Sequence, residues 1–154
     1  MMFKKILIAF DGSEASKRAL DHAADMAYEA KGNLIILTVI PKITLPIFSD
    51  EGFGSAPSAS ARDFGEYQDR MKDTYTRALS EATNDTQKKF PDLSITSIIY
   101  EERPSVAIVE EAEKQEVNLI VMGSRGLGGI SGWILGSTSR RVVESCTKPI
   151  LIIK

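Results

Sequence analysis

Small residues cluster in one stretch of the chain, between a short apolar run and a helical pattern. The stretch opens at Gly123, after the apolar run 119–121, and ends with Gly136 and the hydroxyl residues 137–139. Glycines let a bound group approach the backbone closely, and N–H groups at a helix start point towards an anion with the helix dipole behind them. This pattern predicts an anion site, with phosphate as the obvious anion.

Two common phosphate-binding motifs fit this stretch poorly. A P-loop needs Lys and then Ser or Thr after its last glycine, whereas Ser137 follows Gly136 directly. The dinucleotide fingerprint that could start at Gly126 has Ser131 in place of its third glycine. That turn also comes too late in the chain for the usual acidic partner of the ribose. Neither motif therefore identifies the site.

Apolar runs alternate with amphipathic stretches along the rest of the chain. Apolar runs without polar interruption are typical of strands buried on both faces. The expected strands are 4–10, 33–40, 93–100, 117–122 and 149–153. The expected helices begin at Ser13, at about Arg62, at Pro104 and at Ser137. The third strand is more polar than the others, which suits an edge position.

This alternation predicts a doubly wound α/β fold with five parallel strands and four helices. We expect a single domain over residues 1–154, interrupted by a long loop at about 41–61 that packs on another part of the molecule. The residues alone allow two common strand orders, 3-2-1-4-5 and 2-1-3-4-5. If the order is 3-2-1-4-5, the winding reverses between the first and fourth strands, and a ligand is expected at their carboxyl ends.

Composition limits the functional classes. The chain of 154 residues has 43% hydrophobic and 26% charged residues, and a net charge of -2. These values predict a soluble protein with no general attraction for nucleic acid or membrane. The single Cys146 cannot form an internal disulfide, and no signal-like segment is recognised, so we expect a cytoplasmic location.

Three blocks of the chain resemble the universal stress protein family. The spacing Gly123-x2-Gly126-x9-Gly136-Ser137-Thr138 resembles the ATP-binding signature of this family. The first strand with the following 11–13 turn, and the closing segment 148–153, match as well. The resemblance implies the order 3-2-1-4-5, an adenine nucleotide alpha hydrolase-like fold, in which Asp11 and Gly123 meet at the reversal of winding.

The resemblance also implies roles for single residues. It places Asp11 beside the nucleotide, lets Val39 offer backbone groups to adenine, and makes Ala9 and Met122 line the base and ribose. The phosphates are expected on backbone N–H groups, with nearby hydroxyls as extra donors and Arg125 within reach. The expected phosphate contacts are Gly126, Gly136, Ser137, Thr138 and Ser139. Mg²⁺ would share the phosphate charge, but no protein ligand for it is predicted.

The function expected from these features is that of an ATP-binding regulatory module in a stress response, acting through an unknown protein partner. Which of ATP, ADP and AMP is bound stays open. No catalytic residue is predicted. A slow ATP-hydrolysing enzyme and a nucleotide-independent interaction protein are alternatives, and the intact glycine signature counts against the second. A phosphoacceptor receiver is excluded because Tyr100 and Glu101, rather than Asp, end the third strand.

Assembly is the last expectation. The apolar segment Ile150–Ile153 would form an edge strand in the order 3-2-1-4-5. An exposed apolar edge is an aggregation hazard unless it is covered. A second copy that pairs the same strand antiparallel would cover it, as is common in the family. We therefore expect a homodimer formed through this strand.

Overall fold

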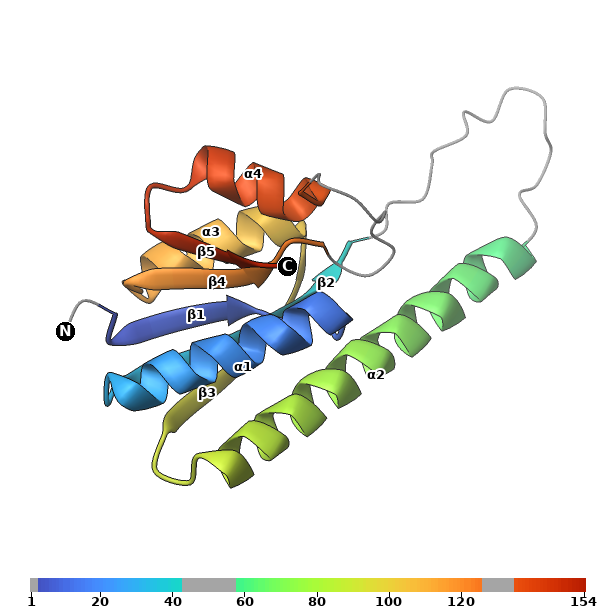
Figure 1. Cartoon of the computed structure of the whole chain (residues 1–154). Coiled ribbons are helices and arrows are strands. Elements are labelled where there is room, and N and C mark those ends of the chain that lie inside the picture. The colour runs from blue at the N-terminus through green and yellow to red at the C-terminus, as the bar shows by residue number, and fades with distance from the viewer. Residues whose placement is uncertain (1–2, 43–57, 126–134) are drawn as a thin grey trace.

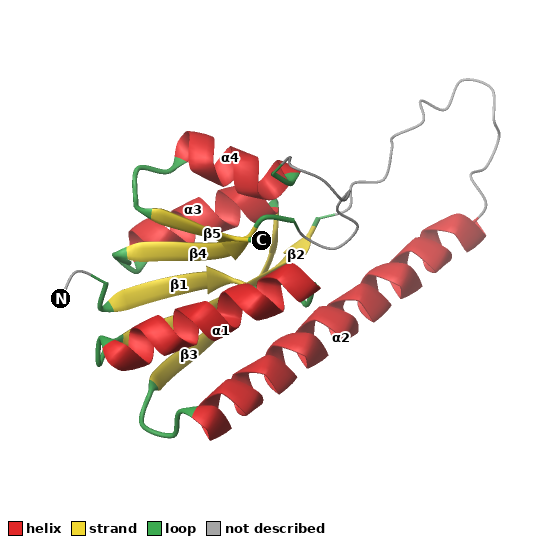
Figure 2. Cartoon of the chain, viewed as in Figure 1, coloured by secondary structure: helices red, strands yellow, loops and turns green. Residues whose placement is uncertain are grey.

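A computed structural model of the chain describes residues 3–42, 58–125 and 135–154. It shows a parallel sheet between two layers of helices (Figures 1 and 2). The strands are β1 (Lys5–Ala9), β2 (Asn33–Pro41), β3 (Ser94–Glu102), β4 (Leu119–Gly123) and β5 (Ile150–Ile153). The helices are α1 (Glu14–Glu29), α2 (Ser58–Lys89), α3 (Pro104–Lys114) and α4 (Ser137–Ser145). The predicted class, a doubly wound α/β fold, is confirmed.

The sheet has the order β3-β2-β1-β4-β5. All four strand pairings are parallel, and Ala9 near the end of β1 lies opposite both Leu37 of β2 and Met122 of β4. Of the two orders that the residues allowed, the structure has the one implied by the family resemblance. The winding reverses between β1 and β4, so the carboxyl ends of these strands flank the place where such sheets bind ligands.

Two apolar cores lie on the two faces of the sheet. Figure 1 shows α1 and α2 on one face, and α3 and α4 on the other. On the first face, Ile6 and Ile8 of β1 pack with the alanines of α1 and with Leu79 of α2. On the second, Leu7 packs with residues of α3 and with Val142 of α4. Strands buried on both faces explain why β1 and β2 are apolar at almost every position.

Most element boundaries lie within two residues of those predicted, and the start of α2 is the main exception. This helix begins at Ser58, so the last residues of the expected loop 41–61 are helical. Residues 43–57 lie outside the described part of the chain, and the predicted packing of this loop stays a prediction. None of the helices within the described residues is long and apolar enough to span a membrane.

The end of α1 lies before Gly32, although a glycine just after a helical pattern is a common C-terminal stop. The C-cap is Ala30, and Lys31 adopts the left-handed conformation with a φ of 51°. Gly32 is needed for another reason, because a Cβ on it would lie 2.1 Å from the Lys4 carbonyl oxygen. The last residue of α1 is Glu29, and Gly32 lets the chain pass close to Lys4, just before β1.

Two helices bury faces that differ from those indicated by the spacing of their apolar residues. On α3, the spacing of Val106 and Val109 predicts a buried face, but both residues are only partly buried, whereas Ile108 and Glu111 are 3% exposed. Glu111 can be buried there because its carboxylate accepts hydrogen bonds from Tyr100 and Gln115. On α2, the helical spacing of Tyr67, Met71 and Tyr75 predicts an aromatic stripe that packs on the core. Tyr67 is nevertheless 54% exposed, because the first half of α2 extends beyond the sheet (Figure 1).

Candidate functional site

A cavity of about 270 Å³ opens at the carboxyl ends of β1 and β4, where the winding of the sheet reverses. All predicted site residues that the structure describes line this cavity. They are Ala9, Asp11, Val39, Met122, Gly123, Arg125, Gly136, Ser137, Thr138 and Ser139. Gly126, the remaining predicted contact, lies outside the described residues. Segments distant in sequence thus converge on one cleft.

The N-terminus of α4 forms one wall of the cleft. Its N-cap is Gly136, which has no side chain to cap the helix, and the N–H of Gly136 donates to the Ser124 carbonyl at 2.8 Å. The first hydrogen bond back to the cap joins the Arg140 N–H to the Gly136 carbonyl at 3.0 Å. The N–H groups of residues 137–139 precede that bond, so the helix supplies them with no acceptor. This end of α4 is open to an anion.

The hydroxyl groups at this end of α4 are not equivalent. Ser139 is 3% exposed, and its Oγ donates to the Ser124 carbonyl at 3.1 Å, with the Gly136 carbonyl 3.3 Å away. This hydroxyl holds the turn together and is already engaged, unlike the free donor that was expected. Ser137 and Thr138 form no side-chain hydrogen bond within the described part of the chain. Their hydroxyls remain available to a ligand.

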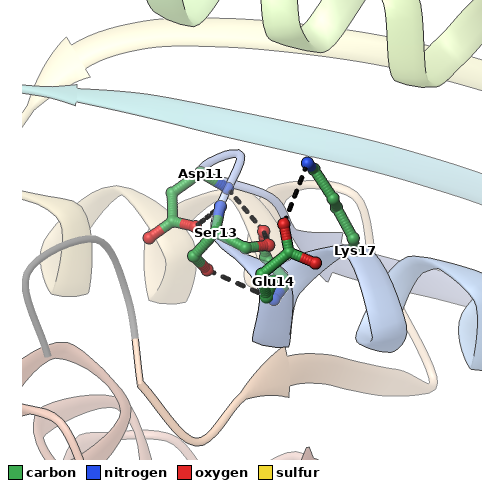
Figure 3. Close-up of polar contacts among 5 residues, drawn as sticks. Asp11, Ser13, Glu14 and Lys17 are labelled. Atoms are coloured by element: carbon green, nitrogen blue, oxygen red, sulfur yellow. Dashed lines mark hydrogen bonds and ion pairs between the residues drawn. The ribbon is translucent and has the colours of Figure 1, made fainter.

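The N-terminus of α1 lies beside the same cleft but is closed by its own side chains (Figure 3). The Ser13 Oγ accepts from the Ser16 N–H at 3.2 Å, and the Ser16 hydroxyl donates to the Ser13 carbonyl at 2.9 Å. The Asp11 carboxylate accepts from the Ser13 N–H at 2.9 Å. These bonds satisfy donors that an anion would otherwise use. Of these two helix starts, α4 is therefore the open one.

Asp11 is held in place from β2 as well. The buried Thr38 donates from its Oγ1 to the Phe10 carbonyl at 2.8 Å, and the Phe10 N–H donates to the Leu37 carbonyl at 2.8 Å. These bonds tie the residue before Asp11 to the neighbouring strand. The end of β1 is therefore rigid where it enters the cleft.

Charge and polarity divide the cleft. Among its described lining residues only Asp11 and Arg125 are charged. The deep wall is apolar and combines Leu37 and Val39 of β2, Ile108 of α3 and Met122 of β4. The α4 end carries the open N–H groups and the hydroxyls. A ligand with one flat apolar part and one anionic part matches this division.

Several lining residues were missed by the sequence-based prediction. Ser16 lies in the first turn of α1, Pro104 is the first residue of α3, and Ile108 lies one turn further along α3. Tyr75 reaches the cleft from α2, although its helical spacing with Tyr67 and Met71 is typical of core packing. The helical spacing of the aromatic residues places Tyr75 on the inner face of α2. This spacing does not show that the inner face extends from the core to the rim of the cleft.

The fold and the cleft therefore define a class of protein. Its members are doubly wound α/β proteins with an open helix N-terminus where the winding of the sheet reverses. The model of the universal stress protein family matches residues 2–154 of the chain. The chain belongs to the universal stress protein family.

Individual relatives agree with this assignment. Universal stress protein YxiE of Bacillus subtilis is 32% identical, and the match covers 99% of this chain and 100% of YxiE. A crystal structure of a universal stress protein in complex with cAMP is 26% identical with a TM-score of 0.62, covering 99% of this chain and 98% of that one. A universal stress protein from Archaeoglobus fulgidus, solved in complex with dAMP, is 22% identical with a TM-score of 0.62 and full coverage of both chains.

Proposed function

We propose that the cleft binds an adenine nucleotide. Among such nucleotides, we propose ATP, because its base can contact the apolar wall while its three phosphates extend along the start of α4. The observation that carries the proposal is the open N-terminus of α4, whose N–H groups and free hydroxyls line the cleft. The phosphates lie against this end, within reach of Arg125. A helix start without a capping side chain favours an anion through its dipole and its unpaired donors.

The adenine is placed against the apolar wall made by β2, α3 and β4. Ile108 and Met122 are 3% and 4% exposed, and Val39 is 8% exposed. A flat base can pack on such side chains while the backbone at the end of β2 supplies hydrogen bonds. The relative solved with cAMP supports an adenine nucleotide as the ligand class.

Mg²⁺ is proposed to enter with the phosphates. Asp11 is the one carboxylate among the described lining residues, and its Oδ1 already accepts a hydrogen bond from Ser13. One carboxylate with phosphate oxygens and waters is a usual environment for this ion. The residues present therefore fit a metal held mainly by the ligand.

A charge placed at the start of α4 tests the proposal. In Thr138→Glu the new carboxylate favours the helix dipole, so the fold is kept, but it repels phosphates at the same N–H groups. Equilibrium titration with ATP should show at least about a tenfold loss of affinity, the equivalent of about 1.4 kcal/mol. Val143→Glu is the matched control, because Val143 is 44% exposed on the same helix and does not line the cleft. Equal affinity in Thr138→Glu and wild type would refute the phosphate position.

We further propose that the nucleotide-bound state of the protein acts as a regulatory signal.

We also propose that the protein is a homodimer formed through β5. This strand lies at the edge of the sheet, and all four of its residues are only partly buried. We also propose that any ATP hydrolysis is slower than the usual enzymatic range of about 1–10³ per second, because none of the described lining residues is a lysine.

A further inference from the structure

Tyr75 is the one residue of α2 among the described residues that line the cleft. Its side chain is partly buried, in contrast to Tyr67 on the same helix, which is 54% exposed. The other aromatic residue in the lining, Phe10, is 3% exposed and belongs to the core below. Tyr75 therefore offers the aromatic ring that a ligand in the described part of the cleft can reach.

The turn after β1 fixes the position of Tyr75. Gly12 has a φ of 87°, and a Cβ on it would lie 3.6 Å from the Cβ of Ala78. This contact sets α2 against the turn that carries Asp11. Tyr75 precedes Ala78 by three residues and so lies on the same side of α2, about one turn nearer to its start. The helix thus brings the ring to the rim of the cleft beside Asp11.

The electrostatic environment of the ring agrees with this position. The pKa of the Tyr75 phenol lies above its ordinary value of 10.0, first because of burial and then because of the negative charges of Asp11 and of ionised Tyr67. The phenol is therefore neutral at physiological pH. A neutral phenol presents both a flat ring and a hydrogen-bond donor to a ligand.

The ring belongs to the end of the cleft away from the phosphates. α2 packs along β2 and β3, whereas α4 packs against α3 on the opposite face of the sheet (Figure 1). Tyr75 therefore reaches the cleft from the β2 and β3 half of the sheet, although the side chains of Leu37 and Val39 belong to the core on the α3 and α4 face. The open N–H groups of Ser137–Ser139 lie beyond β4, because the Gly136 N–H donates to the carbonyl of Ser124, the residue after β4. Since β1 separates β2 from β4, the ring and these N–H groups enter the cleft from opposite sides.

We propose that Tyr75 is a specificity contact for the base of the nucleotide, with its ring packed against the purine. This inference rests on the proposed function, since it concerns the same cleft. Aromatic side chains that stack on bases contribute to affinity through the flat face of the base and leave phosphate binding alone. Tyr75 gives the cleft a preference for nucleotides over bare polyphosphates.

The test compares ATP with inorganic tripolyphosphate, each titrated into the full chain. Tyr75→Leu removes the ring and keeps an apolar side chain, and it should weaken ATP about tenfold while tripolyphosphate binds as to wild type. Tyr75→Phe keeps the ring and should retain most of the ATP affinity. Tyr67→Leu, on the exposed part of the same helix, is the control and should bind both ligands normally.

The outcomes separate this inference from the proposed function. Wild-type affinity for ATP in Tyr75→Leu would overturn the role of Tyr75 alone. An equal loss for both ligands would overturn it too, because a distorted cleft explains that result. If the wild-type chain binds neither ATP nor tripolyphosphate, the proposed function itself fails.

A second measurement needs no disruptive substitution. Alkaline titration of the tyrosine absorbance should show that ATP raises the pKa of one phenol further, because a bound base shields it from water. The change should be absent in Tyr75→Phe and with tripolyphosphate. A tyrosine titration of the wild-type chain that ATP leaves unaltered would contradict the contact.

Discussion

Gly123, at the end of β4, lies against Ala15 in the first turn of α1 so closely that no side chain fits between them. A Cβ on Gly123 would lie 2.8 Å from the Cβ of Ala15 and 2.9 Å from its carbonyl carbon. The contact brings the chain that leaves β4 next to the capped start of α1. Two walls of the cleft can therefore lie this close because residue 123 has no side chain.

This contact predicts a cost for a small substitution. Gly123→Ala should lower the free energy of unfolding by about 1–3 kcal/mol, because backbone and side chain of Ala15 must move to accept the methyl group. Gly65→Ala is the control with the opposite sign. A Cβ at Gly65, within α2, meets nothing within 4 Å, so alanine should stabilise this helix by up to about 1 kcal/mol. Urea denaturation measures both, and equal stability of Gly123→Ala and wild type would contradict the contact.

The fold could largely be predicted because its signals are local. Ser13 was expected to cap α1, and its Oγ does accept from the Ser16 N–H. Ser137 was expected to start α4 and does so. The order of the strands could not be predicted from local signals, because patterns of apolar residues do not show which strands are neighbours. The family resemblance supplied that order.

The details that could not be predicted depend on distant contacts. Lys31 adopts the left-handed conformation, and Gly32 follows it at a place where a Cβ would meet the Lys4 carbonyl. Glu111 is buried because Tyr100 comes from another element to bond it. Ser139 was expected to offer its hydroxyl to phosphate, but only the folded turn shows the Ser124 carbonyl beside it. Whether the cleft residues bind a nucleotide stays a prediction.

Removal of the metal should change affinity according to the number of phosphates. Mg²⁺ is proposed to share the charge of the phosphates with the N–H groups of α4 and with Arg125. Chelation should therefore weaken ATP clearly and AMP much less, because AMP carries less charge into the cleft. Titrations of both nucleotides with Mg²⁺ and with excess chelator provide the measurement. Equal effects on ATP and AMP would argue against a phosphate-bound metal.

Stability at alkaline pH should depend on Tyr75. Its folded pKa is raised above the ordinary 10.0 by burial and by Asp11, so the folded state holds the phenolic proton more tightly than the unfolded chain. The contribution of this proton to the free energy of unfolding is complete below pH 10.0, and it is lost as the pH rises through the folded pKa of Tyr75. Tyr75→Phe has no such proton, and the midpoint of urea denaturation should fall less between neutral pH and about pH 11 than in wild type. Parallel losses in the two proteins would show that the phenol makes no difference.

The edge strand β5 offers a precise test of the proposed homodimer. The Ile120 N–H donates to the Pro149 carbonyl, and the Ser124 N–H donates to the Ile153 carbonyl. Because inward and outward positions alternate in a parallel ladder, the N–H of Ile152 points to the open edge. Ile152→Pro removes this outward donor, and we expect folded monomers in light scattering at concentrations where the wild-type chain is a dimer. Leu151→Pro, at an inward position, should instead destabilise the sheet. A wild-type chain that stays monomeric at every accessible concentration would end the dimer proposal.

The most direct measurement of the central claim is the change in backbone amide resonances when ATP with Mg²⁺ is added to the full chain. We expect the largest shifts at Ser137, Thr138 and Ser139, whose N–H groups are open at the start of α4. We expect smaller shifts at Ser16, whose N–H is already bonded to the Ser13 Oγ. Unchanged resonances at the start of α4 under saturating ATP, or the largest shifts at the start of α1, would contradict phosphate binding at the N-terminus of α4.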